Sequence, residues 1–334
     1  MDAATHALTS FALTRGFFPN RRWPAILGII FAGTFADIDW FSAWFGPAAY
    51  FTAHRTFTHS IPGTILVIAL AVLFTRYISR KDQPEPLPPL LLPLTVAAAL
   101  HVLLDLLQSE GVAVLRPFSG KRYAPDLLPS FDLWILALLL AGIFIPELFR
   151  LVSSEIGAKD KRPRGRNGAL IALALIAAYI GARAILHANS VAALDPHSYK
   201  GESARSVAAY PDSLSVLTWH GVVETQSYLC QVPVPAGLGK SFDAESADCL
   251  HKPEPSPELD VAQKTKVAQA YINAMPFPRA TVSRTPDGSE ILLRSMRDAA
   301  ENQTRHRLGA RILVGPQLKI SSQELIWLSD INIR

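Results

Sequence analysis

The chain has 334 residues, of which 49% are hydrophobic and only 18% are charged, whereas an ordinary soluble domain carries about 25% charged residues. The shortage is local, because the long apolar runs lie within residues 1–190, while residues 191–334 resemble an ordinary soluble chain. This composition excludes a purely soluble protein. It predicts a transmembrane domain over residues 1–190 and a water-facing domain over residues 191–334.

The first domain contains several apolar segments that are long enough to cross a bilayer, which takes about 20 residues. In chain order they are 23–45, 60–79, 88–107, 131–151 and 168–187, preceded by a shorter apolar segment at 3–18. We therefore expect a mainly α fold, with a polytopic transmembrane bundle of about five to six helices. No cleavable signal peptide is expected, because Asp2 stands where a basic region would precede the first apolar run.

Lysine and arginine in the connecting loops predict how the bundle is oriented. Three basic connections, at 19–22, 76–87 and 150–166, fall on one side, which the positive-inside rule assigns to the cytoplasm. The densest run, "AKDKRPRGR" at 158–166, could also contact nucleic acid. The membrane interpretation explains all three loops together, so we expect no nucleic-acid partner and an extracytoplasmic C-terminal domain.

One loop breaks this pattern. The connection at 108–130 carries Arg116, Lys121 and Arg122, yet the topology places it outside. Basic residues there could steer an anionic head group towards the protein.

The second domain shows the short alternating runs of a small α+β fold. We expect strands within 215–234, 280–296 and 306–318, a hairpin turn at "PDG" (286–288), and a helix over 256–275 capped by Ser256. Its two cysteines, Cys230 and Cys249, have no zinc-finger spacing. They could pair in an oxidising compartment or remain as two thiols, and the sequence leaves both possibilities open.

Ionisable side chains embedded in or flanking the apolar segments are the main functional signal, because such groups are costly in a membrane and are usually paired or functional. Under the predicted topology all of them lie near the outer face: His6, Asp37, Asp39, His54, Arg55, His59, His101, Asp105 and Asp132. The topology was assigned from lysine and arginine alone, so this agreement is independent of it.

Local spacing says which of these groups share a helix face. His101 and Asp105 are four residues apart and project from one face. Asp37 and Asp39 would point the same way in an extended or broken stretch and would diverge in an unbroken helix. His54 and His59 are five apart and cannot share a face of a regular helix, so the fold has to bring them together.

Imidazole and carboxylate together suit zinc, manganese or iron(II), and zinc is the commonest where hydrolysis is intended. The six or seven candidate ligands exceed one tetrahedral site and suggest two or three metals. Arg55 could hold an oxyanion as a bidentate donor, and Asp39 or Asp132 could serve as a general base.

Simpler explanations remain for the individual residues. His101 and Asp105 could form a hydrogen-bonded pair within the membrane, His59 could cap a helix, and Asp37 and Asp39 could lie in a solvated loop. As a whole, the cluster could serve a proton or ion transporter, or it could be a structural or sensory metal site in a non-enzymatic membrane protein.

The order of these motifs resembles a known family. "TH" (5–6), "DID" (37–39), "HRTFTHS" (54–60), "HVLLD" (101–105), "RPFSGKRY" (116–123) and "FD" (131–132) resemble the YdjM-like family, described as LexA-regulated, inner-membrane metal-dependent hydrolases. The resemblance covers about the first 150 residues. Where the family usually has "PDID", this chain has Ala36 in place of the proline.

The resemblance carries its own implications. It implies metal ligands at His6, Asp37, Asp39, His59, His101 and Asp105, supported by His54, Arg55 and Asp132, and a distant likeness to zinc-dependent phospholipase C. Taken with the residues, it predicts a multi-pass bacterial inner-membrane hydrolase. We expect its substrate to be a phosphoester or ester of a membrane lipid or lipid-linked phosphate.

Overall fold

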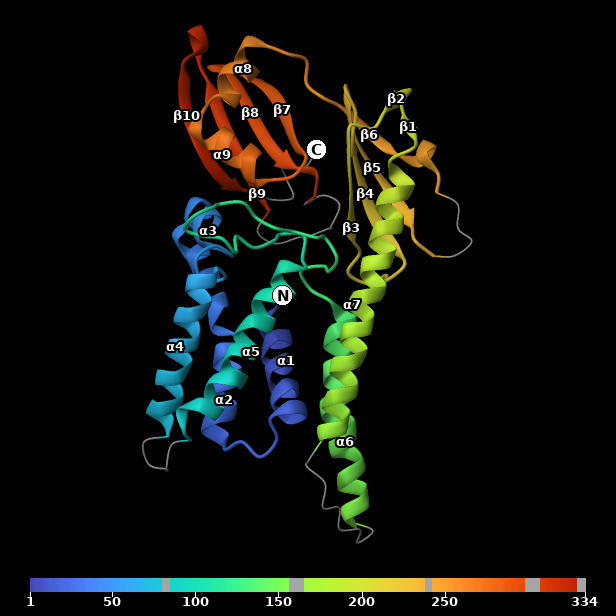
Figure 1. Cartoon of the computed structure of the whole chain (residues 1–334). Coiled ribbons are helices and arrows are strands. Elements are labelled where there is room, and N and C mark those ends of the chain that lie inside the picture. The colour runs from blue at the N-terminus through green and yellow to red at the C-terminus, as the bar shows by residue number, and fades with distance from the viewer. Residues whose placement is uncertain (80–84, 156–164, 238–241, 298–306, 329–334) are drawn as a thin grey trace. The chain divides into compact units, whose positions relative to one another are not determined.

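The computed structural model describes residues 1–79, 85–155, 165–237, 242–297 and 307–328. It divides into two compact units: Met1–Trp40 with Ala53–Ala184, and Phe41–Thr52 with Ile185–Arg334 (Figure 1). Two basic residues of the predicted cytoplasmic loops, Arg80 and Lys81, and most of the run at 158–166 lie outside the described residues. The predicted domain boundary at residue 190 stays a prediction.

The first unit is helical, as predicted. Its elements, with η1 and α3 reaching into the second unit and α7 continuing there, are α1 (Ala3–Phe17), α2 (Trp23–Ala32), a 3-10 helix η1 (Phe35–Phe45), α3 (Pro47–Ala53), α4 (Ile61–Ile78), α5 (Leu87–Leu106), α6 (Leu133–Glu155) and α7 (Arg166–Leu194). Within the described residues, four helices, α4 to α7, are long and apolar enough to span a membrane. The count rises to five if α2 and η1, bent by 49°, form one broken span.

The break between α2 and η1 divides the apolar segment predicted at 23–45. α2 ends at Ala32, and at the capping Gly33 an added Cβ would lie 1.9 Å from Ser10 Oγ of α1. Thr34 follows, and its hydroxyl donates to Ile30 O at 2.9 Å, a local bond of the kind that competes with regular helix geometry. The break therefore comes from close helix packing joined to a local side-chain bond.

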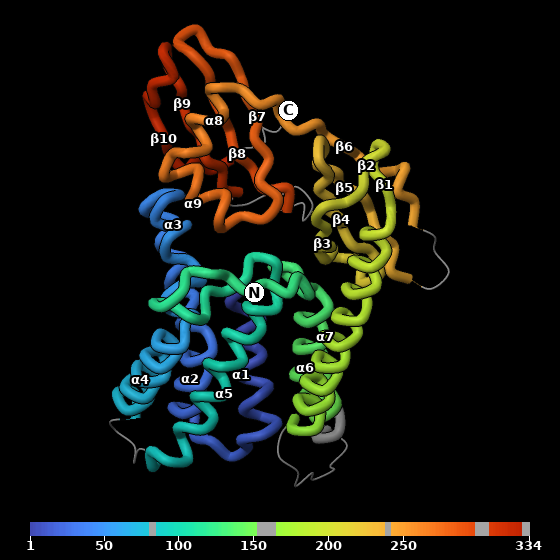
Figure 2. Tube along the Cα trace, turned by 45° about the horizontal axis from the view of Figure 1, so that its top comes forward, coloured from blue at the N-terminus to red at the C-terminus, as the bar shows by residue number. Residues whose placement is uncertain are grey.

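The basic ends of these helices are tied together. Arg15 near the end of α1 bonds Glu147 of α6 at 2.6 Å, and Arg21 before α2 bonds Glu85 before α5 at 2.8 Å. The trace in Figure 2 places these turns at the end of the bundle opposite the N-terminus. The first unit thus has one end rich in ion-paired arginines and a second end formed by the start of α1, the start of α4 and the end of α5.

The second unit is the predicted α+β fold. Its strands are β1 (Ser198–Tyr199), β2 (Glu202–Ser203), β3 (Ser206–Pro211), β4 (Thr218–Glu224), β5 (Tyr228–Pro235), β6 (Asp248–His251), β7 (Pro278–Thr285), β8 (Gly288–Ser295), β9 (Leu308–Val314) and β10 (Ile320–Trp327). They form a small β1–β2 pair and two antiparallel four-stranded sheets, ordered β3-β4-β5-β6 and β10-β9-β8-β7. Short 3-10 turns, η2 (Ala244–Ser246) and η3 (Pro316–Leu318), complete it.

The helix predicted over 256–275 is two helices, α8 (Pro257–Gln263) and α9 (Lys266–Ala274). Ser256 caps the first as predicted, but Thr265 accepts from Ala268 N and begins a second helix there. Cys230 of β5 and Cys249 of β6 lie directly opposite each other and form a disulfide. The pairing that the sequence left open is therefore the one this structure has.

Candidate metal centre

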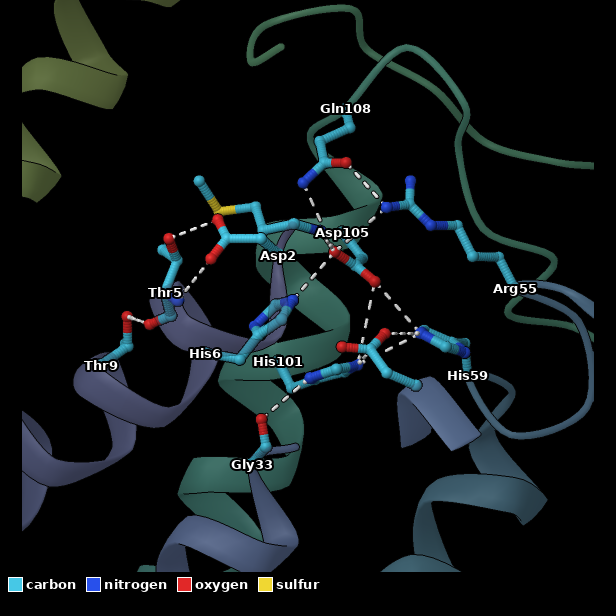
Figure 3. Close-up of polar contacts among 12 residues, drawn as sticks. Asp2, Thr5, His6, Thr9, Gly33, Arg55, His59, His101, Asp105 and Gln108 are labelled. Carbon is cyan, nitrogen blue, oxygen red and sulfur yellow. Dashed lines mark hydrogen bonds and ion pairs between the residues drawn. The ribbon is translucent and has the colours of Figure 1, made fainter. Parts of the chain in front are cut away.

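Five candidate ligands come together at the end of the first unit that lies opposite the paired arginines. His6 comes from the start of α1, His59 from the turn before α4, and His101 and Asp105 from the last turns of α5 (Figure 3). Asp37 comes from η1. Four of them, His6, Asp37, His101 and Asp105, offer ligand atoms that all lie within 4.8 Å of one another. This is one such group among the described residues, and more than one ion stays a prediction.

The orientation of His101 is set by the broken helix. Its Nδ1 lies 2.9 Å from the carbonyl oxygen of Gly33 at the end of α2. A carbonyl only accepts, so Nδ1 carries the proton and Nε2 presents a lone pair to the cluster. The close approach that needs glycine at residue 33 therefore also supplies the acceptor that fixes this tautomer.

His59 is fixed in the same manner from the opposite side. Its Nδ1 lies 3.1 Å from Asp39 Oδ2 and 2.9 Å from Thr58 Oγ1, so Nδ1 donates and Nε2 faces inward. His59 Nε2 is 3.1 Å from His101 Nε2 and 3.1 Å from Asp105 Oδ2. When both rings are neutral, two imidazole lone pairs and a carboxylate oxygen therefore converge, an arrangement that a proton on His59 or a metal cation would stabilise.

The spacing suits a metal. Zinc–nitrogen bonds of about 2.0–2.1 Å in a tetrahedron place neighbouring ligand atoms roughly 3.3 Å apart, close to the 3.1 Å between the two Nε2 atoms. Asp37 Oδ1 lies 3.6 Å from both of these nitrogens. His6 Nε2 lies 3.1 Å from Asp105 Oδ1, and its ring centroid is 3.9 Å from that of His101.

Two buried polar atoms of the cluster have no hydrogen-bond partner among the described residues, His6 Nδ1 and Asp37 Oδ2. Buried polar atoms are usually satisfied, so such exceptions need an explanation. A metal or its water would satisfy the carboxylate oxygen. Asp105 draws further cations as well: the amino group of Met1 and the guanidinium of Arg55 both contact its Oδ1.

The pKa of His59, which lies before α4 begins, reflects the carboxylates around it. Burial lowers the pKa of His59, but hydrogen bonds with Asp105, Asp37 and Asp39 outweigh this and raise the pKa to about 10. The carboxylates therefore draw a proton to the histidine when no other cation is present. Proton and metal compete for the same inward lone pair.

Asp39 and His54, both predicted as ligands, lie in a layer behind His59. Asp39 Oδ1 contacts His54 Nδ1 at 3.0 Å, while Oδ2 accepts from Arg55 N at 2.9 Å and from Thr58 Oγ1 at 2.5 Å. Neither residue belongs to the group of converging atoms. The contacts give Asp39 an orienting position, and its roles as ligand and base stay predictions.

Arg55 is buried, at 4% exposure, and reaches over Asp105. Its Nη2 donates to Gln108 Oε1 at 2.8 Å, and its Nη1 lies 3.5 Å from Glu110 Oε2. Gln108 and Glu110 were not among the residues predicted from the sequence. Gln108 could have been predicted from the sequence, because it follows His101 and Asp105 at helical spacing on the same face.

Asp132 lies elsewhere in the unit. Its Oδ1 accepts from Trp134 N and Ile135 N at 3.0 Å each at the start of α6, and its Oδ2 accepts from the Tyr179 hydroxyl at 2.9 Å. None of these partners is a candidate ligand. The structure gives Asp132 a helix-capping contact, and the catalytic role predicted for it is untested.

The fold and the cluster define the class: a polytopic helical membrane protein with a buried histidine–aspartate group that could hold a metal ion. The YdjM inner membrane protein family matches residues 1–190, more than half of the chain, so this chain belongs to that family.

A curated relative extends the comparison. The chain is 32% identical over 155 residues to the "Uncharacterized protein YfhP" of Bacillus subtilis (strain 168), which covers 43% of this chain and 46% of the relative. The chain thus spans about half of that protein's length. No solved structure matches the chain.

Proposed function

We propose that this chain is a membrane-bound, metal-dependent hydrolase that acts on a phosphoester or ester of a lipid-like substrate. The observation that carries the proposal is the convergence of the Nε2 atoms of His59 and His101 at 3.1 Å, each turned inward by a partner on its Nδ1. When a metal displaces the proton from His59 Nε2, two inward lone pairs beside Asp105 form a receptor for the cation.

His6, Asp37, His59, His101 and Asp105 would hold the metal, and the mixture of imidazole and carboxylate favours zinc, with manganese or iron(II) as alternatives. When bound, such an ion lowers the pKa of a water molecule and polarises a phosphoryl or acyl oxygen.

The chain's own residues supply the rest. Asp39 holds His59 in its tautomer, and Gly33 holds His101. The unpartnered Asp37 Oδ2 is placed to accept a proton from water, which makes it a better base than Asp39, whose oxygens are both engaged. Arg55, over Asp105, would hold an anionic oxygen of the substrate.

A transporter is the second candidate, and one observation favours it. The bent α2–η1 pair carries Asp37 just beyond its break, and broken helices form ion sites in many transporters. Such folds use paired breaks, whereas this is one bent pair among the described residues. All of the converging atoms also lie at one end of the helices, which suits a surface reaction better than a relay across the membrane.

We further propose a bacterial inner-membrane location with the second unit on the periplasmic side. The Cys230–Cys249 disulfide supports this, because disulfides persist in oxidising compartments. Within the first unit, the paired arginines lie at the end away from the candidate ligands, which agrees with the positive-inside rule.

The test combines metal content with turnover. Purified protein is stripped with chelator, titrated with zinc, and assayed against a panel of phospholipids and phosphodiesters. We expect zinc-dependent hydrolysis that is lost in His59→Ala and Asp105→Ala. Zinc binding without turnover of any panel member would overturn the hydrolase in favour of a structural or sensory site, and no zinc binding would overturn both.

A further inference from the structure

The loop between α5 and α6 holds an apolar tip flanked by cations. Tyr123 and Val112 close it with two backbone hydrogen bonds, N to O at 3.1 Å and 3.0 Å, so residues 113–122 form an ordered excursion. At its end Phe118 is 92% exposed, the most exposed large apolar side chain among the described residues. A tight turn holds Phe118 there, with its N–H on Leu115 O at 2.9 Å.

The loop begins beside the first residue of a helix that is long and apolar enough to span a membrane. Ile61, the first residue of the membrane-spanning helix α4, donates its N–H to Val114 O at 3.1 Å. Residues 115–118 therefore begin level with the start of a span, on the side where α5 ends and α6 begins. A side chain exposed at this height meets lipid head groups and the first methylenes of the acyl chains, where aromatic rings are favoured.

Two of the three cations in this loop are available. Arg116 and Lys121 have no carboxylate within ion-pair distance in the described part of the chain, and Lys121 Nζ lies 5.4 Å from the centre of the Tyr123 ring. Arg122 is engaged, because its Nη2 donates to His54 O at 2.8 Å. Of the three basic residues that break the positive-inside pattern, Arg116 and Lys121 could therefore bind a ligand, while Arg122 holds the loop against the segment of His54.

The loop is tied to the segment that carries the ligand His59. Besides the bond from Arg122 to His54, Ala113 donates its N–H to Arg55 O at 3.1 Å. Lipid held by the loop would therefore be held beside the backbone that positions Arg55 and His59.

We propose that residues 115–123 form a lipid-capture loop, in which Phe118 enters the adjacent leaflet while Arg116 and Lys121 bind the phosphate of an anionic phospholipid. The inference rests on the proposed hydrolase and names its substrate class: an anionic phospholipid drawn from the bilayer. The charge decides the occupant, since a zwitterionic surface would gain little from two unpaired cations, whereas each cation near an anionic surface contributes about fivefold in affinity.

The experiment uses the whole chain in nanodiscs. Both native cysteines are in the disulfide, so Phe118→Cys places a single free thiol for a bimane label. Brominated phosphatidylglycerol or phosphatidylcholine is titrated in, and quenching of the label is followed. Leu214→Cys, on an exposed side chain of the second unit, is the matched control.

We expect a blue-shifted label at residue 118 that both lipids quench, with phosphatidylglycerol preferred. The Arg116→Ala, Lys121→Ala double variant should reduce this preference about twenty-five-fold, the product of two fivefold terms. Quenching without a lipid preference, or a preference that the double variant retains, would overturn the head-group role. A blue-shifted label that neither lipid quenches would mean that protein covers Phe118, and a label behaving like the Leu214→Cys control would mean that water does; either result would overturn the insertion of Phe118.

None of these readouts needs metal or turnover. Capture that persists in His59→Ala, in a preparation that hydrolyses nothing, would leave the loop proposal standing while the hydrolase falls. Hydrolysis without lipid capture would overturn the loop proposal and leave the hydrolase standing.

Discussion

Adding one methyl group at Gly63 should damage the proposed metal centre without changing any candidate ligand. Gly63 is the third residue of α4, and its N–H donates to the capping Ser60 Oγ at 3.2 Å. A Cβ at this position would lie 1.8 Å from Phe57 O, so the gap has to open by roughly 1.6 Å to reach ordinary contact at 3.4 Å. The obstructing atom is backbone, and the turn that must move carries His59.

The magnitude follows from that displacement. Overpacking of a well-packed site costs about 1–3 kcal/mol of stability. His59 Nε2 lies only 3.1 Å from His101 Nε2 and from Asp105 Oδ2, so a shift of the turn by even part of this distance would spoil the geometry of the candidate ligands. Loss of an orienting contact typically lowers metal affinity by about 10–100-fold, and we expect Gly63→Ala to fall in that range.

The assay is a competition titration of zinc against a chromophoric chelator, together with a melting curve of the detergent-solubilised protein. Gly181→Ala is the control, because a Cβ there meets nothing within 4 Å and alanine favours the helix. Wild-type zinc affinity in Gly63→Ala, with an unchanged melting temperature, would refute the packing that we infer between this turn and α4.

Three further predictions concern single residues. Asp39→Asn should lower zinc affinity about 10–100-fold in the same titration, because the neutral amide has one acceptor oxygen, whereas the carboxylate uses one oxygen for His54 and the other for His59; an unchanged affinity would contradict the orienting role. Cys230→Ser should lower the free energy of unfolding by about 3 kcal/mol for a loop of this length, and reductant should destabilise the wild type but not the variant. Burial raises the pKa of Asp212, but backbone donors in its turn and His220 together lower the pKa below its usual value. Asp212 therefore stabilises the folded state above about pH 4, and this stabilisation is lost as the pH falls through the folded pKa. Asp212→Asn should therefore be less stable than wild type at pH 7 and equal to it in strong acid, as chemical denaturation at each pH would show.

Helix positions were predictable because they depend on local quantities. Apolar length and capping residues put the spans within a few residues of α4 and α5, and the Ser256 cap was correct. The break after α2 was beyond such reasoning, because it depends on Ser10 lying against Gly33, two residues from different helices. The division of the helix at Thr265 could have been predicted from the sequence, because threonine is a good N-cap residue.

Part of the candidate site was predictable from the sequence. Membrane depth, inferred from loop charges, grouped five residues that the structure brings together, but it also grouped Asp132, which lies elsewhere. Depth does not say which nitrogen of an imidazole turns inward, and that choice separates the ligand side of His59 from the side held by Asp39. It follows from hydrogen bonds to Gly33 and Asp39 that only the folded chain makes.

The "DID" motif (37–39) and the segment from His54 to His59 contact each other in the folded chain, and these contacts account for the spacing of both. In "DID" the two carboxylates address opposite nitrogens of one ring: Asp37 Oδ1 lies 3.6 Å from His59 Nε2, and Asp39 Oδ2 lies 3.1 Å from His59 Nδ1. The five-residue spacing of His54 and His59 then has a purpose, because both histidines hold Asp39, one on each oxygen. Arg55, at a positive φ of 55°, turns the chain between them and donates its own N–H to the same carboxylate. The segment is therefore a clamp on Asp39, and its effect is to leave one nitrogen of His59 free to face the cation site.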